Sequence, residues 1–208
     1  MNLYFLRHAP TLANITGSMV KDYNSYGIVP LENNTIESWK KEVGIHLPKD
    51  FKVVCSPQKR CIDTAKLLFK DKPFQISINL EEFDCSGIGD KKFWELSEEE
   101  LTTSTHLFKQ DMYVKIIRLL KELRSKFKED NVVCISHGFY TRTVISYIRG
   151  MLDTPLELLC SKNIKFNNLD LYDLYNDKIF HFFCKISRYI AAYLVLKKFS
   201  FCYIINKY

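Results

Sequence analysis

Three apolar runs, far apart in the sequence, each lead into a short polar segment that carries basic side chains. The residues of these segments that could do chemistry are, in chain order, Arg7, His8, Arg60 and His137. A guanidinium group binds phosphate oxygens through paired N–H donors, and a neutral imidazole can serve as a nucleophile or a base. Brought together, these residues would form an anion site whose histidines suit phosphoryl transfer.

The elements that must position these residues are three predicted strands. The apolar runs at 2–6, 52–55 and 132–135 have strand character, and helical patterns alternate with them as far as about residue 150. This alternation predicts an α/β fold with right-handed connections. Ligands of open α/β sheets bind beyond the carboxyl ends of the strands, so we expect the basic residues to share one edge of the sheet.

A helix is predicted directly after the second strand. Ser56 is a good N-cap, Pro57 suits the first helical position, and apolar spacing continues to about Phe69. Arg60 then lies in the first turn, near the positive end of the helix dipole, where an anion is favoured.

Periodicity and turn residues define the rest of the chain. The remaining predicted elements are a short helix capped by Thr35 and stopped at Gly44, a strand at 75–79, an excursion over the site at 83–108 with a short helix near 97–103, an amphipathic helix at 109–128, a helix from Gly138 to about Arg149, a short helix at 154–159, and an antiparallel hairpin of 168–175 with 178–185.

Four motifs follow one another along the chain. They are Leu6-Arg7-His8-Ala9-Pro10-Thr11 with Asn14, Ser56-Pro57-x-x-Arg60 with Thr64-Ala65, Leu80-Glu81-Glu82-Phe83-Asp84, and Ser136-His137-Gly138 with Arg142. In order and spacing, from about residue 2 to about residue 175, they resemble the motifs of the histidine phosphatase superfamily, also called the phosphoglycerate mutase-like family. Four motifs in order are far more specific than one. The chain departs from the family at Ala9, where glycine is usual.

The resemblance implies a three-layer α/β/α sandwich with a mostly parallel central sheet. It also implies a covalent phosphohistidine intermediate, in which neutral His8 attacks phosphorus while its other ring nitrogen stays protonated against an acceptor such as a backbone carbonyl. The implied phosphate ligands are Arg7, Arg60, His137 and, as a neutral donor, Asn14. We expect no metal or other cofactor, because the arginines provide the positive field.

Glu82 is the expected proton donor to the leaving oxygen, since it matches the acid residue of the family motif. The adjacent Glu81 should point the other way if the segment is extended, because successive side chains then alternate. The alternative for Glu82 is an ordinary solvated loop carboxylate.

The fate of the phosphohistidine separates a phosphatase, which transfers the group to water, from a mutase, which transfers it to a hydroxyl. The family's mutases carry a Phe-Thr-Gly-Trp-like segment after the first motif, and Gly17-Ser18-Met19-Val20 does not match it. The sequence therefore favours a phosphomonoester hydrolase of a small phosphorylated metabolite. A mutase-type phosphotransferase, a protein phosphohistidine phosphatase and a catalytically inactive binding protein stay open as alternatives.

Composition is that of a globular protein, with 208 residues, 47% apolar and 26% charged. We expect one domain over 1–185 and an apolar, basic tail over 186–208. Five of the six net positive charges lie in residues 185–208. The body is therefore close to neutral, and we expect no nucleic-acid partner. A docked terminal helix or strand is the favoured interpretation of the tail, with a poorly ordered or atypical terminus and weak contact to a membrane surface as alternatives.

Seven cysteines, without a C-x-x-C pair, indicate buried reduced thiols and a cytoplasmic protein. The sequence predicts no signal peptide, because Arg7 and His8 interrupt the first apolar run. It predicts no membrane span either, because no stretch reaches roughly 18 apolar residues. The oligomeric state stays open.

Overall fold

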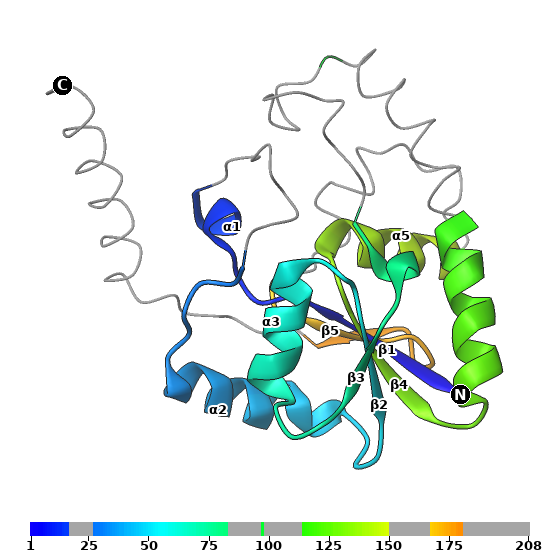
Figure 1. The fold of residues 1–208 in the computed structure, drawn as a ribbon, viewed down its shortest axis with the longest axis horizontal. Coiled ribbons are helices and arrows are strands. Elements are labelled where there is room, and N and C mark those ends of the chain that lie inside the picture. Colours follow the sequence, from blue (N-terminus) through cyan, green and yellow to red (C-terminus); the bar gives the residue numbers. More distant parts are fainter. Residues whose placement is uncertain (17–26, 83–96, 98–113, 150–166, 181–208) are drawn as a thin grey trace, which may run out of the picture.

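A six-stranded sheet forms the centre of the fold (Figure 1). The structure, a computed structural model, describes residues 1–16, 27–82, 97, 114–149 and 167–180. In spatial order the strands are β3 (Phe74–Ile76), β2 (Lys52–Cys55), β4 (Asn131–Ser136), β1 (Asn2–Arg7), β5 (Leu171–Asp173) and β6 (Lys178–Phe180). The first four are parallel, and β5 and β6 form an antiparallel hairpin. The predicted α/β class, with a mostly parallel sheet and a C-terminal hairpin, is confirmed.

Helices cover both faces of this sheet (Figure 1). Alternate residues of β1 show the two sides: Leu3 and Phe5 pack in a core with α5 and the helix of residues 114–127, whereas Tyr4 and Leu6 pack in a core with α2 and α3. Three layers result. The helical segments are α1 (Leu12–Thr16), α2 (Asn33–Glu42), α3 (Lys59–Leu68), residues 114–127, α5 (Gly138–Ile148) and the 3-10 turns η1 (Gly44–His46) and η2 (Ile78–Leu80).

The start of α3 differs from the sequence prediction. The helix begins at Lys59 with Gln58 in the N-cap position, so the prediction that Ser56 caps the helix and Pro57 opens it is wrong. The reason is that Ser56 still continues the strand pairing: its N–H donates to the carbonyl of Ile135 at 3.0 Å. The predicted placement of Arg60 in the first turn of the helix is confirmed.

The start of α2 also differs. Thr35 lies inside the helix rather than at its cap, because its N–H already donates to the carbonyl of Glu32, which occupies the N-cap position. Trp39 in this helix belongs to the core, since 2% of the residue is exposed. Its indole N–H donates to the carbonyl of Leu169 at 3.0 Å and so ties α2 to the segment before β5.

The strand predicted at 75–79 is shorter, and it ends at Ile76. The chain then turns into η2, where Ser77 Oγ and Asn79 Nδ2 donate to the Glu122 carboxylate at 2.7 and 3.0 Å. These bonds join η2 to the helix of residues 114–127, whose apolar face is buried as predicted. The backbone N–H of Ser77 still donates to the Cys55 carbonyl at 2.9 Å, so the chain leaves the sheet only after this residue.

Several predictions fall outside the described residues: the excursion at 83–108 apart from Ser97, residues 109–113, the helix at 154–159, and the tail at 186–208. Within the described part of the chain, Cys55, Cys61 and Cys134 are free and buried, as predicted. No helix in that part is both long enough and apolar enough to cross a bilayer.

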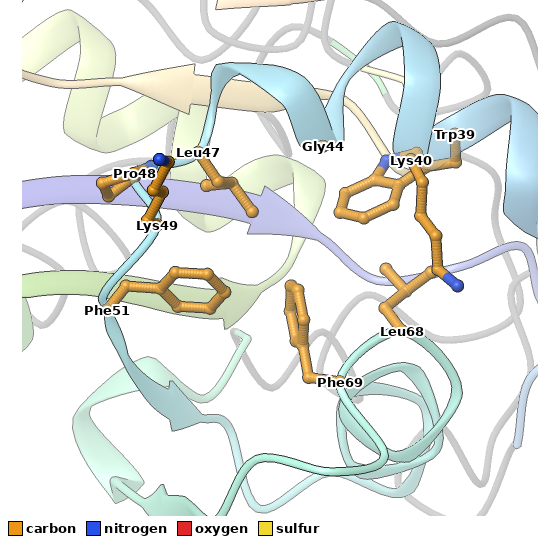
Figure 2. A pocket seen from close by; sticks show the side chains of 9 residues that line it. All are labelled: Trp39, Lys40, Gly44, Leu47, Pro48, Lys49, Phe51, Leu68 and Phe69. Atoms are coloured by element: carbon orange, nitrogen blue, oxygen red, sulfur yellow. The ribbon is translucent and has the colours of Figure 1, made fainter.

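A cavity of about 280 Å³ opens between η1 and the end of α3 (Figure 2). Its lining is mainly apolar and aromatic, with two lysines: Trp39, Lys40, Gly44, Leu47, Pro48, Lys49, Phe51, Leu68 and Phe69. None of the predicted chemical residues is among them. The candidate site therefore lies elsewhere, at the carboxyl edge of the parallel strands.

Candidate active site

The carboxyl ends of β1, β2 and β4 meet at one edge of the sheet. Arg7 pairs in register with Ser136, and the His8 N–H donates to the Ser136 carbonyl at 2.9 Å. The ring centroids of His8 and His137 are therefore only 5.4 Å apart, although 129 positions separate the two residues. Parallel pairing alone brings the first and third motifs together.

The imidazole of His8 is buried, with 2% of the residue exposed. Its Nδ1 lies 2.7 Å from the carbonyl oxygen of Ala9. A carbonyl accepts but cannot donate, so Nδ1 carries the proton and the lone pair is on Nε2. The Ala9 N–H in turn donates to Thr64 Oγ1 at 2.8 Å, which holds this acceptor in place from α3. Both bonds use only the backbone of Ala9.

Both site histidines are held in the neutral form. Burial, followed by the positive charges of Arg60 and Arg7, lowers the pKa of His8 well below its usual value. Burial first, then Arg60, His8 and Arg7, lowers the pKa of His137 in the same direction. A neutral imidazole is the form that can act as a nucleophile.

Arg60 reaches His137 from the first turn of α3. Its Nε donates to Nδ1 of His137 at 3.1 Å, and Nε2 of His137 lies 2.9 Å from Ser56 Oγ. Because Nδ1 accepts, the proton of this imidazole is on Nε2, and the bond to Ser56 runs from the ring to the hydroxyl oxygen. Ser56, wrongly predicted as a helix cap, instead orients His137.

Arg7 lies against the start of α5. A Cβ atom added to Gly138 would be 2.8 Å from both Cζ and Nε of Arg7, so the arginine side chain would have to shift. Glycine after His137 therefore permits the close approach of the Arg7 guanidinium. A larger residue at position 138 would therefore displace the Arg7 side chain from its present place.

Glu82 is buried with 7% of the residue exposed, so the solvated-loop alternative does not describe it. Its carboxylate accepts the N–H groups of Tyr140 at 3.1 Å and Phe139 at 3.3 Å, in the first turn of α5. Glu81 is half-buried and is the last residue before it. The structure thus places the Glu82 carboxylate at the helix that follows His137.

Asn14 lies in α1, and its amide is fixed through its oxygen. Oδ1 accepts from the N–H of Thr11 at 3.1 Å, from Thr11 Oγ1 at 3.0 Å and from Asn168 Nδ2 at 3.2 Å. With the oxygen engaged, the amide presents its N–H donors elsewhere, as a phosphate ligand would need. Asn168 also donates to the carbonyl of His8 at 2.9 Å and so links Asn14 to His8.

Sequence reasoning missed three residues of this site: Ser56 in its actual role, Gln58 and Asn168. The second motif singles out Ser56 and Arg60 but leaves position 58 open, and Asn168, as the first residue of the predicted hairpin, carried no sign of a role in the site. The sequence also gave no reason to connect Cys61 with His137, whose Nε2 is 3.5 Å from Sγ. Burial raises the pKa of this thiol well above its usual value, so it stays protonated.

Among the described residues, no group of three or more His, Cys, Asp or Glu side chains could hold a metal ion. Positive charge in the site comes from two arginines instead. The arrangement can bind an anion next to a neutral imidazole with a free Nε2 lone pair, with a carboxyl group at the neighbouring helix. That combination suits transfer of a phosphoryl group to a histidine.

Comparison with known proteins agrees with the motifs. Residues 3–176 match the family model described as histidine phosphatase superfamily (branch 1). The chain therefore belongs to this family. No curated protein sequence matches the chain at a significant level.

Solved structures with the same fold include a phosphoserine phosphatase mutant from Entamoeba histolytica in complex with phosphoserine, with a TM-score of 0.63 and 18% identity over 82% of this chain and 88% of that one. A mycobacterial glucosyl-3-phosphoglycerate phosphatase gives 0.55 and 18% over 82% and 90%. A phosphoglycerate mutase from Bacillus anthracis gives 0.57 and 16% over 86% and 90%. At these identities the likeness shows the fold alone.

Proposed function

We propose that the chain is a phosphomonoester hydrolase that acts on a small phosphorylated metabolite through a phosphohistidine intermediate. The observation that carries the proposal is the bond of His8 Nδ1 to the Ala9 carbonyl at 2.7 Å, which leaves the Nε2 lone pair of a neutral, buried imidazole for attack. Membership of the histidine phosphatase superfamily supports it.

In the first step, Nε2 of His8 attacks phosphorus and the bond to the ester oxygen breaks. Arg7, Arg60 and the N–H donors of Asn14 bind the equatorial oxygens, where negative charge gathers in the transition state. His137 is the remaining proposed ligand, and its Nε2–H, which is directed to Ser56 Oγ in the structure, would have to turn from this hydroxyl to the phosphate. Arginines supply this charge without a divalent ion, so the proposal includes metal independence.

The leaving oxygen takes a proton from Glu82 in the same step. Water then attacks the phosphohistidine, Glu82 accepts a proton from that water, and inorganic phosphate leaves His8 free again. The N–H groups of Phe139 and Tyr140 stabilise the carboxylate form that exists between the two steps. An anionic phosphate in the crevice favours the protonated acid, by charge repulsion, at the start.

A mutase transfers the group to a second hydroxyl instead of water, and a mutase is among the structures that share the fold. We favour hydrolysis because the segment after the first motif lacks the mutase pattern. In addition, the solved structures with this fold include phosphatases that are named for different small phosphoesters, phosphoserine and glucosyl-3-phosphoglycerate.

The test is turnover of p-nitrophenyl phosphate by the full chain and by His8→Ala, followed by a panel of small phosphoesters. We expect hydrolysis by the full chain, at least 10²-fold slower turnover by His8→Ala, and a ³²P-labelled intermediate that is stable to base and labile to acid, as expected for a phosphoramidate. Activity lost in EDTA and restored by Mg²⁺ would contradict the proposal. So would equal activity of His8→Ala.

A further inference from the structure

Gln58 is a buried polar residue in the second motif, with 7% of the residue exposed. It occupies the N-cap position of α3 with φ −68° and ψ 135°, two residues before Arg60. Its backbone carbonyl accepts the N–H of Cys61 at 2.9 Å and so starts the helix. Its side chain is directed across the site, where it meets two other parts of the proposed machinery.

One oxygen atom of Gln58 makes both contacts. Oε1 accepts a hydrogen bond from Nη2 of Arg60 at 2.7 Å, and it accepts the backbone N–H of Glu82 at 3.4 Å. The first bond is short and charge-assisted, and it is therefore the stronger of the two. The second joins the same atom to the segment that ends with the candidate acid.

The two bonds of Arg60 together fix its guanidinium plane. Nε donates to His137 Nδ1 on one side, and Nη2 donates to Gln58 Oε1 on the other. A planar group held through two of its nitrogens has little freedom to rotate, so the direction of its other donors is set. Binding of phosphate by a guanidinium that is already oriented loses less side-chain entropy than binding by a mobile guanidinium.

We infer that Gln58 is a positioning residue that couples the phosphate-binding arginine to the proton donor. Through Oε1 it sets both the orientation of the Arg60 guanidinium and the position of the Glu82 backbone. The inference has two halves. The catalytic half, which concerns Glu82 as proton donor, rests on the proposed function. The binding half concerns only the anion site and holds for any phosphate that enters it.

Two substitutions separate these halves. Gln58→Leu has similar volume but removes the acceptor, so it should release both Arg60 and the Glu82 segment. Gln58→Glu keeps an acceptor oxygen for the Glu82 N–H but places a negative charge beside Arg60, which opposes an incoming anion. Gln75→Leu is the matched control, because Gln75 is exposed on β3 at the sheet edge.

Binding of inorganic phosphate is measured by isothermal titration, which needs no turnover. We expect about 10-fold weaker binding for Gln58→Leu, because it removes the acceptor that holds Arg60, and for Gln58→Glu, because it adds a negative charge beside Arg60. Gln75→Leu should bind phosphate like the unchanged protein. Unchanged phosphate binding by Gln58→Leu overturns the inference.

The catalytic half is measured as the ratio of kcat/KM for an alkyl phosphate to that for p-nitrophenyl phosphate, because only the alkyl ester depends strongly on the acid. We expect this ratio to fall several-fold in Gln58→Leu and to stay within about twofold in Gln58→Glu, which keeps the bond to Glu82. A purely structural role would lower both esters equally in both variants, and that result also overturns the inference.

Failure of the proposed function has a different signature. If the unchanged protein hydrolyses no ester in a His8-dependent way, the proposed function is wrong. Phosphate titration then still decides whether Gln58 sets the orientation of the Arg60 guanidinium. Thermal unfolding with and without phosphate identifies a variant that does not fold. If Gln58→Leu is that variant, Gln58→Met, which also lacks the acceptor, replaces it: unchanged phosphate affinity in Gln58→Met overturns the inference.

Discussion

Arg60 donates its Nε–H to Nδ1 of His137 at 3.1 Å, across 77 positions of the sequence. This bond does two things at once. It fixes the tautomer of His137 with the proton on Nε2, facing Ser56, and it anchors one side of the guanidinium. The second and third motifs of the family are therefore a single unit in space, in which an arginine and a histidine orient each other.

Arg60→Lys keeps the positive charge but loses the planar guanidinium group with its several N–H donors. A lysine offers one ammonium group in place of the nitrogens that bind His137 and Gln58, so it cannot satisfy both. We expect kcat for p-nitrophenyl phosphate to fall by about 10²–10³-fold, as on loss of a preorganised donor. Arg124→Lys, on the exposed side of the helix of residues 114–127, is the control and should not change kcat. A decrease in kcat of less than threefold in Arg60→Lys would contradict the role of the guanidinium group.

The two site histidines should stay neutral at a pH where an ordinary histidine is half protonated. Burial and the arginine charges lower the pKa of both below 6.5. We expect ¹⁵N-detected NMR of the full chain to show both rings neutral at pH 6.5, with the proton of His8 on Nδ1 and that of His137 on Nε2. Titration of either ring at pH 6.5 or above would contradict this.

The same shifts have a consequence for stability. Because the folded state resists protonation of His8 and His137, the unfolded chain binds more protons once the pH falls below about 6.5. Their contribution to stability is therefore fully present above that pH and is lost as the pH falls from it toward the folded-state values. Urea unfolding of the unchanged protein between pH 7.5 and pH 5.5, with His8→Ala for comparison, measures this contribution. The loss should be smaller in the variant.

Much of this site could be predicted from sequence because its residues lie at the carboxyl ends of strands, which are recognisable in the sequence. Apolar runs identify β1, β2 and β4, and parallel pairing of these strands then places Arg7, His8 and His137 at one edge without further information. The fold class follows from the same alternation of strands and helices. These features depend on burial, which leaves a periodic pattern in the sequence.

The parts that could not be predicted depend on single hydrogen bonds between distant residues. Ser56 has the sequence features of a helix cap, but the Ile135 carbonyl holds it in the strand, so α3 starts three residues later at Lys59. Asn168 contacts the His8 carbonyl across 160 positions, and neither residue has a neighbour that signals this. Such contacts follow from tertiary placement, which no local pattern encodes.

Thr64→Val tests how the acceptor of His8 is held. The Thr64 hydroxyl accepts the Ala9 N–H and donates to the Arg60 carbonyl at 2.7 Å, and valine has the same shape without either bond. Leaving the buried Ala9 N–H unsatisfied should cost about 1–3 kcal/mol of unfolding free energy, measured in urea. Turnover should also fall, because the Ala9 carbonyl orients His8. Unchanged stability together with unchanged kcat would contradict the role of Thr64.

Residues 186–208 are proposed to be unnecessary for catalysis. Every motif lies before them, and the match to the family model ends at residue 176. We expect a chain truncated after Lys185 to keep kcat and KM for p-nitrophenyl phosphate within about twofold. Phosphate titration of the truncated chain shows whether the site is intact. A truncated chain that binds phosphate but does not turn over would mean that the tail takes part in the reaction.

The last prediction concerns Glu81 and Glu82, since the two adjacent carboxylates must be told apart. If Glu82 donates the leaving-group proton, Glu82→Gln should slow hydrolysis of an alkyl phosphate by about 10²–10⁴-fold. An activated aryl phosphate has a leaving group that needs little protonation, so p-nitrophenyl phosphate should lose much less. Glu81→Gln should change neither rate by more than about twofold, because only the Glu82 carboxylate binds the N–H groups of Phe139 and Tyr140 among the contacts of the described residues.

Glu82→Gln also alters a contact at the start of α5, because an amide presents one oxygen where the carboxylate presented two. The unfolding free energy of both variants is therefore measured in urea, and the comparison of the two esters is made within one variant, where any loss of folded protein cancels. A greater loss on the alkyl ester in Glu82→Gln alone assigns the proton donor. An equal loss on both esters, or a greater loss on the alkyl ester in Glu81→Gln, means that another group protonates the leaving oxygen.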